Sequence, residues 1–200
     1  MRPFAHTALA LTVAAACTIA PAPEGTGPGG TDSTLPPGHG TLRQEDVSLS
    51  LTSGDLRLMV TPLHESVTRV TAPDTDRRLS SLAAAHAVDP GSGGRGLFLV
   101  SFYSEQPDVP FVPEEVQFVS RGLRVRPDRI MPVTPSWGER RVGQRQTEMA
   151  VYWFGDAVDL ESPLVLAYQF EQSTQWSAIL PRIQAERARV RARAGIGPPA

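Results

Sequence analysis

Apolar and polar residues alternate along much of the chain after residue 44, and this period of two is the feature that most restricts the fold. The alternation runs through residues 47–51 and returns in residues 56–60, beyond the turn sequence Ser-Gly-Asp at 53–55. Successive side chains of a strand point to opposite faces, so the pattern predicts a hairpin with one buried face and one solvated face.

Other segments are apolar at successive positions, which is typical of strands buried on both faces. These segments are residues 97–103, 149–154 and 164–170, and a shorter pair at 116–119 and 123–125 is joined by Ser-Arg-Gly. Together they predict a mainly β fold of about seven to eight short-turned strands, arranged as an antiparallel sandwich or barrel.

The pattern across residues 44–172 resembles that of the immunoglobulin-like domains of exported bacterial proteins. The resemblance implies an antiparallel immunoglobulin-like β-sandwich, in which Trp153 beside Tyr152 is a loose analogue of the core tryptophan. The antibody-type disulfide is excluded because the chain has a single cysteine. A fold of this kind does not by itself assign a function.

Two segments depart from the strand pattern and predict helices. Residues 74–87 begin at Asp74, a good N-cap, and place Leu79, Leu82 and His86 at helical spacing. We expect this short helix to lie across one end of the sandwich.

The second helix is an amphipathic C-terminal helix within residues 173–195. Its apolar stripe at 3.6-residue spacing consists of Trp176, Ile179, Leu180, Ile183 and Val190. Arg182, Arg189, Arg191 and Arg193 are expected to point away from the domain. Pro181 either kinks this helix or is its first residue.

The N-terminal residues carry an export signal. Arg2 is followed by a nine-residue apolar run at 8–16 that ends in small residues, which is typical of a secretory signal peptide covering residues 1–16. At about 1.5 Å per residue the run is too short for the roughly 30 Å core of a bilayer. We expect an exported protein without a membrane-spanning segment.

Cys17 directly follows Val-Ala-Ala-Ala at 13–16, and this sequence resembles the lipobox of bacterial lipoproteins, although Ala14 stands where leucine is commonest. The resemblance implies that Cys17 is acylated and anchors the protein to a membrane surface. The alternative is plain cleavage, which leaves Cys17 as a free thiol or removes it by cutting after Ala20 or Ala22. Residues 18–43 contain five prolines and six glycines, so we expect residues 17–43 to be a lipidated cysteine with a disordered tether.

Composition excludes several function classes. All 19 basic residues are arginine, so Schiff-base chemistry and a phosphate-binding P-loop lysine are excluded. The single cysteine excludes a redox pair and a thiolate zinc site. A net charge of -2 and a pI near 6.1 argue against nucleic acid as a partner.

No motif assigns a catalytic, cofactor-binding or metal-binding residue. The glycines of residues 91–96 match GxGxxG but precede a strand instead of a helix, so they predict a loop. The acidic pair within 74–76 falls in the first turn of a helix, where acids favour the positive dipole end. The acids within 156–161 could bind Ca2+ but are expected to form a solvated loop. His64 and His86 lack zinc-protease spacing.

Arginine is distributed unevenly. Seven arginines fall within residues 121–145, and five fall within residues 182–193 beside one acid, Glu186. If they converge they form a basic face for phosphate or carboxylate groups, such as lipid head groups or the acids of a partner; the alternative is a solvated surface.

The sequence therefore predicts a non-catalytic binding or assembly module, lipid-anchored at the bacterial envelope, with the membrane and an anionic envelope partner as its contacts. Two alternatives stay open: a hydrolase that uses carboxylates, and a structural subunit that assembles by pairing of strand edges.

Overall fold

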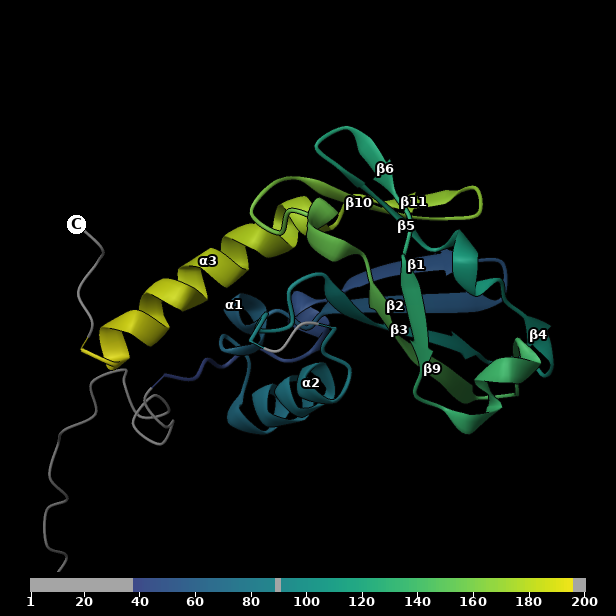
Figure 1. The fold of residues 1–200 in the computed structure, drawn as a ribbon, viewed down its shortest axis with the longest axis horizontal. Coiled ribbons are helices and arrows are strands. Elements are labelled where there is room, and N and C mark those ends of the chain that lie inside the picture. The colour runs from purple at the N-terminus through teal and green to yellow at the C-terminus, as the bar shows by residue number, and fades with distance from the viewer. Residues whose placement is uncertain (1–37, 89–90, 196–200) are drawn as a thin grey trace, which may run out of the picture. The chain divides into compact units, whose positions relative to one another are not determined.

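The computed structural model describes residues 38–88 and 91–195. The chain divides into two units, residues 1–33 and 34–200, and the described residues all belong to the second unit. The predicted signal peptide, Cys17 and most of the predicted tether therefore lie outside the described residues. The second unit is mainly β, with antiparallel sheets and a C-terminal helix (Figure 1).

The strands form a five-stranded sheet in the order β1-β2-β3-β9-β7, a four-stranded sheet in the order β11-β10-β5-β6, and a small sheet of β4 and β8. Their bounds are β1 (Leu49–Ser53), β2 (Leu56–Pro62), β3 (Leu97–Ser104), β4 (Val109–Pro110), β5 (Gln117–Ser120), β6 (Leu123–Val125), β7 (Arg129–Pro132), β8 (Arg141–Val142), β9 (Gln146–Trp153), β10 (Leu164–Tyr168) and β11 (Glu171–Ser173). The described residues thus contain eleven strands instead of seven to eight. The strands that the sequence analysis missed, β4, β7, β8 and β11, have two to four residues and are too short to show alternation.

Helical segments connect and cover these sheets. Their bounds are α1 (Glu65–Thr68), α2 (Pro73–Ala85) and α3 (Trp176–Arg193), with 3-10 turns η2 (Glu45–Val47), η3 (Pro113–Glu115), η4 (Pro135–Glu139) and η5 (Gly155–Ala157).

The two larger sheets share one hydrophobic core, which is compatible with a β-sandwich. Phe98 and Phe102 of β3 lie in this core, and the ring centroid of Phe98 is 4.7 Å from that of Phe118 on β5. The alternate β3 residues Leu97 and Leu99 lie in a second cluster, with residues of α2. The prediction that this strand is buried on both faces is confirmed.

The first predicted hairpin is also confirmed. β1 and β2 are antiparallel, with Leu49 opposite Val60 and Ser53 opposite Leu56. Gly54 in the turn has a φ of 57°, in the left-handed region that glycine adopts without a steric penalty.

The helix α2 covers a face of the five-stranded sheet. The prediction that it lies across one end of the sandwich is therefore wrong. Pro73 occupies its first helical position and Ala72 is the N-cap in place of Asp74. Proline suits this position because the N–H that it lacks has no partner within the helix. Leu79 and Ala83 pack against residues of β3 and β9 that face away from the shared core.

The C-terminal helix α3 runs through Pro181 and begins five residues before it. The predicted apolar stripe is buried at Trp176, Ile179 and Ile183, which join the core shared by the sheets. The indole Nε1 of Trp176 also donates a hydrogen bond to the carbonyl oxygen of Leu160 at 3.1 Å. Within the described part of the chain, no helix has both the length and the apolar character needed to cross a membrane.

One predicted feature of α3 is wrong. Arg193 does not point away from the domain: its side chain is 16% exposed and donates to Glu186 and to the backbone oxygen of His39. The two acceptor distances are 3.1 and 2.9 Å. The buried Glu186 explains this, because a buried carboxylate draws in cations and N–H donors.

The chain is packed on the domain before residue 44, where the folded part was expected to start. Gly40 donates its N–H to the backbone oxygen of Arg69 at 2.9 Å, and Leu42 forms a parallel bridge with Thr71. Thr41 donates its N–H to Glu186 at 3.0 Å. The last residues of the predicted tether are therefore part of the folded unit.

Candidate anion-binding site

The short helix α1 lies beside three hollows of the surface. His64 is its N-cap: Nδ1 accepts a hydrogen bond from the Ser66 N–H at 3.4 Å and lies 2.7 Å from the Ser66 hydroxyl oxygen. Glu65 and Ser66 each face two of the hollows. The three hollows therefore share residues of α1 and differ in the other residues that line them.

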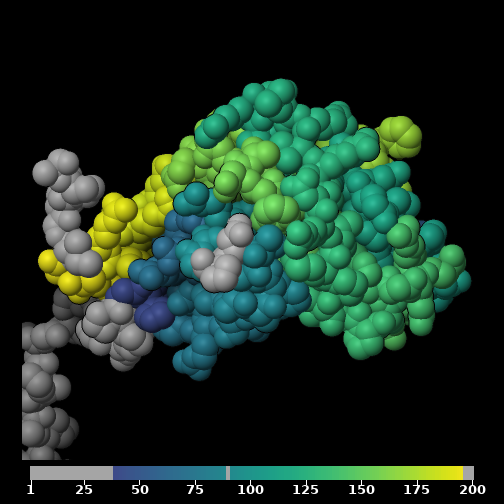
Figure 2. All heavy atoms as spheres, in the orientation of Figure 1, coloured from purple at the N-terminus to yellow at the C-terminus, as the bar shows by residue number. Residues whose placement is uncertain are grey.

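The basic cleft lies between α1 and the C-terminal half of α3 and has a volume of about 380 Å³. Among the described residues of its lining, the charged ones are Arg69, Arg187, Arg191 and the acid Glu65. Gly38, the first described residue, also lines it. In Figure 2 the yellow end of α3 lies beside the purple start of the described chain.

Arg187 lines the basic cleft and donates hydrogen bonds to two residues that line the next cleft. Its Nε donates to the backbone oxygen of Ser66 at 2.9 Å, and its Nη1 donates to Glu161 at 2.7 Å. Its Nη2 is buried and has no hydrogen-bond partner within residues 38–88 and 91–195. A guanidinium that keeps one unused donor is suited to an additional oxygen anion, because its N–H groups are held in a rigid plane.

The other two arginines of the basic cleft extend its charge. Arg69, the C-cap of α1, is exposed and forms an ion pair at 3.4 Å with Glu65, four residues earlier. Arg191 is exposed, and no ion pair is found for it among the described residues. An exposed i,i+4 ion pair contributes only about 0.3–0.5 kcal/mol to stability, so breaking it to let Arg69 bind a ligand costs little free energy.

The charge-paired cleft, on the other side of Ser66, has a volume of about 420 Å³ and contains the predicted acidic loop. Each acid of this loop faces an arginine. Asp156 lies 3.9 Å from Arg95, Asp159 lies 2.6 Å from Arg121, and Glu161 lies 2.7 Å from Arg187.

Asp159 is held as a carboxylate. Hydrogen bonds from the Ser162 hydroxyl, the Arg121 guanidinium and the Glu161 N–H lower its pKa from 3.8 to about 2. A carboxyl group with a lowered pKa is unsuited to the role of general acid, which requires a proton near neutral pH. No group of three or more His, Cys, Asp or Glu residues within the described ranges is positioned to hold a metal ion.

The histidines of the domain have local roles. Burial lowers the pKa of His64 against the opposing effect of Glu65, and Arg95 and Arg187 lower it further, so the imidazole is neutral at pH 7. His86 is the C-cap of α2, with Nδ1 3.0 Å from the backbone oxygen of Leu82. This position corrects the expectation that His86 lies within the helix.

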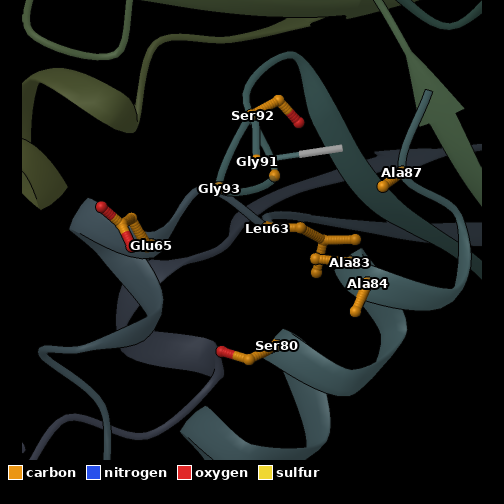
Figure 3. Close-up of a pocket in the computed structure, with 10 residues that line it drawn as sticks. Leu63, Glu65, Ser80, Ala83, Ala84, Ala87, Gly91, Ser92 and Gly93 are labelled. Atoms are coloured by element: carbon orange, nitrogen blue, oxygen red, sulfur yellow. The ribbon is translucent and has the colours of Figure 1, made fainter. Parts of the chain in front are cut away.

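The glycine-rich loop contributes to the third hollow, of about 290 Å³, which Figure 3 shows between α1, α2 and the loop. The loop precedes β3, as the sequence analysis predicted. A Cβ at Gly94 would collide with the backbone oxygen of Leu63, so this close approach requires glycine. The described residues of the lining are mostly alanine and glycine and include no cation, so they offer few groups for recognition.

The structure does not gather all of the predicted arginines on one face. Only Arg187 and Arg191 of the predicted set line the basic cleft, and Arg69 was not foreseen. Several of the others have acidic or aromatic neighbours elsewhere: Arg121 with Asp159, Arg140 with Glu114, Arg141 with Asp108, Arg182 with Asp46, and Arg129 over the ring of Trp153.

Comparison of the chain with family models, with curated proteins and with solved structures finds no match.

Proposed function

We propose that this protein is an exported, lipid-anchored module of the bacterial cell envelope that binds an anionic group, a phosphate or a carboxylate, in the basic cleft. The observation that carries the proposal is that Arg69, Arg187 and Arg191 line one cleft. Arginine is the side chain best suited to these groups, because its planar N–H donors match two oxygens of the anion at once.

The position of the cleft supports a membrane-facing role. Gly38, the first described residue after Cys17 in the sequence, is itself a lining residue of the cleft. An acyl chain on Cys17 would keep the protein at a bilayer, where anionic head groups are concentrated. Each arginine near such a surface contributes about 1 kcal/mol of attraction.

The finer classification of the fold is part of the proposal. Two antiparallel sheets that share an aromatic core support an immunoglobulin-like sandwich. Against it stands the strand order of the five-stranded sheet. β1, β2 and β3 are consecutive neighbours, but the next strand of this sheet, β9, pairs with β3, whereas a Greek key would return a strand beside β1.

The test measures binding of the full chain to membranes after removal of the acyl anchor by Cys17→Ser. Vesicles that contain phosphatidylglycerol should bind this protein, and vesicles of phosphatidylcholine alone should not. The double change Arg69→Gln, Arg191→Gln should weaken binding about 30-fold, since two arginines contribute about 2 kcal/mol together.

A matched control removes the same charge elsewhere. Arg77 and Arg124 are exposed and lie outside the basic cleft, so Arg77→Gln with Arg124→Gln should change vesicle binding little. Inorganic pyrophosphate, compared with sodium chloride of equal ionic strength, distinguishes a free phosphate ligand from a head group. Equal losses in the two double variants would show that the effect is net charge and not the cleft.

A further inference from the structure

Phe170 is a large apolar side chain that is fully exposed, and packing of the fold does not account for its position. The sequence pattern places it in a buried strand, but β10 ends at Tyr168 and Phe170 lies in the turn before β11. Its side chain is 100% exposed, against 71% for Leu123, the next most exposed large apolar residue among those described. Gln169 beside it has a φ of 53°, so the turn itself is in an unfavourable left-handed conformation.

The ring borders a cleft of about 370 Å³. Glu115, Gln117, Arg126 and Gln169 form the rest of the lining. The volume lies in the range of about 300–1,000 Å³ that small-molecule sites occupy. Figure 1 shows the β10–β11 turn at the end of the four-stranded sheet, where it extends into solvent.

Two oxygen acceptors in this lining have no partner. Glu115 Oε2 and Gln117 Oε1 are buried and accept no hydrogen bond from the residues that the structure describes, and Gln117 as a whole is only 9% exposed. Buried acceptors without donors are unfavourable. The terminal torsions of glutamate and glutamine are broad, so these oxygens can rotate about the last side-chain bond to meet a donor in the cleft that both residues line.

The lining therefore defines what a ligand must offer. It must donate hydrogen bonds to Glu115 and Gln117, accept one from the exposed Arg126, and present an apolar face to the Phe170 ring. A simple anion would be repelled by Glu115, a metal ion would make no use of Arg126 or Phe170, and a purely apolar ligand would leave both acceptors unpaired.

We propose that this cleft binds a pyranose sugar. Each hydroxyl of a sugar both donates and accepts, which satisfies carboxylate, amide and guanidinium groups together. The C–H groups on one face of a pyranose ring form an apolar surface that packs on an aromatic ring. Phe170 is the stacking residue, and Glu115, Gln117 and Arg126 fix the orientation of the ring.

The experiment is calorimetric titration of the full chain with tetrasaccharides of N-acetylglucosamine, of β-1,4-linked glucose and of mannose. At least one should bind at millimolar concentration or below. Phe170→Ala should weaken that binding at least tenfold without changing the melting temperature, because the ring makes no contribution to the core. Leu123→Ala is the matched control and should bind as the wild type does.

Arg126→Gln should weaken binding of the same sugar and confirm that the cleft, and not the ring alone, is occupied. Three results would overturn the proposal. They are the absence of binding by all three tetrasaccharides, full binding by Phe170→Ala, and loss of a stoichiometric protein partner by Phe170→Ala in the absence of any sugar binding.

Discussion

Glu186 joins the two ends of the folded unit through a single buried carboxylate. It is 1% exposed and accepts hydrogen bonds from the N–H and hydroxyl of Thr41 at 3.0 and 3.1 Å. Arg189 and Arg193 donate to it from the same helix at 3.2 and 3.1 Å. A carboxylate is stable in this position because each of its oxygens has charged or N–H donors.

The pKa of Glu186 gives its contribution a pH dependence. Burial raises this pKa, but the hydrogen bonds from Arg193, Arg189 and Thr41 outweigh burial and leave it below the usual 4.5. The folded state therefore binds the proton less readily than the unfolded state. The resulting stability is present above pH 4.5 and is lost as the pH falls through the lowered pKa.

We predict that Glu186→Gln lowers the free energy of unfolding by about 2 kcal/mol at pH 7, because hydrogen bonds to a charged group are replaced by weaker ones. Urea unfolding at pH 7 and pH 3 measures it, and the difference from wild type should shrink at pH 3. Glu171→Gln, at an exposed position on β11, is the control. Equal stability of the two variants would contradict the role given to Glu186.

At the scale of the element, α3 tolerates a proline that its own hydrogen bonding disfavours. Pro181 is the sixth residue of the helix, where its ring removes an N–H donor and crowds the carbonyl of Ser177. The helix persists because Trp176, Ile179 and Ile183 are buried in the shared core on both sides of the proline. Tertiary packing here outweighs local propensity.

We predict that Pro181→Ala raises the free energy of unfolding by about 1–3 kcal/mol, since the substitution restores the lost hydrogen bond. Pro181 is exposed, so alanine at this position leaves the core unchanged. Thermal unfolding of wild type, Pro181→Ala and the control Pro163→Ala, an exposed proline outside helices and strands, measures the effect. A lower melting temperature for Pro181→Ala would mean that the proline sets a bend on which the packing depends.

Helices and strands were predictable from the sequence where a regular pattern of apolar residues extends over several positions and these residues are buried. The apolar runs of β3 and β9 show in the sequence because both of their faces are buried. Phe170 was placed wrongly because an apolar residue after a strand is read as part of that strand, whereas the chain turns at Gln169.

The candidate site was harder to predict, because it depends on contacts between distant segments. The arginine-rich helix was visible in the sequence, and Arg187 and Arg191 belong to the basic cleft. Nothing local indicates that Arg69, the C-cap of a four-residue helix more than a hundred residues earlier, joins them. The spacing of seven residues does place Arg193 on the helix face of Glu186, but the sequence does not show that Thr41 and His39 cover this face.

At the scale of the whole molecule, the proposed anchor and the basic cleft depend on each other. Twenty residues separate Cys17 from Gly38 in the sequence. If Cys17 is acylated as proposed, head-group binding at the cleft becomes an event at the same membrane surface, so a weak contact there would be sufficient. Without an acyl chain, one arginine-lined cleft would bind only a fraction of the protein to the membrane.

We predict that labelled palmitate is incorporated into the wild-type chain expressed in bacteria and not into Cys17→Ser, because Cys17 is the only cysteine of the sequence. Thr18→Ser, a conservative change at the next residue, should be labelled like the wild type. Fractionation should place the wild type with membranes and most of the Cys17→Ser protein in the soluble fraction, because one basic cleft cannot replace two or three buried acyl chains. Equal labelling of wild type and Cys17→Ser would exclude acylation and leave plain cleavage of an export signal.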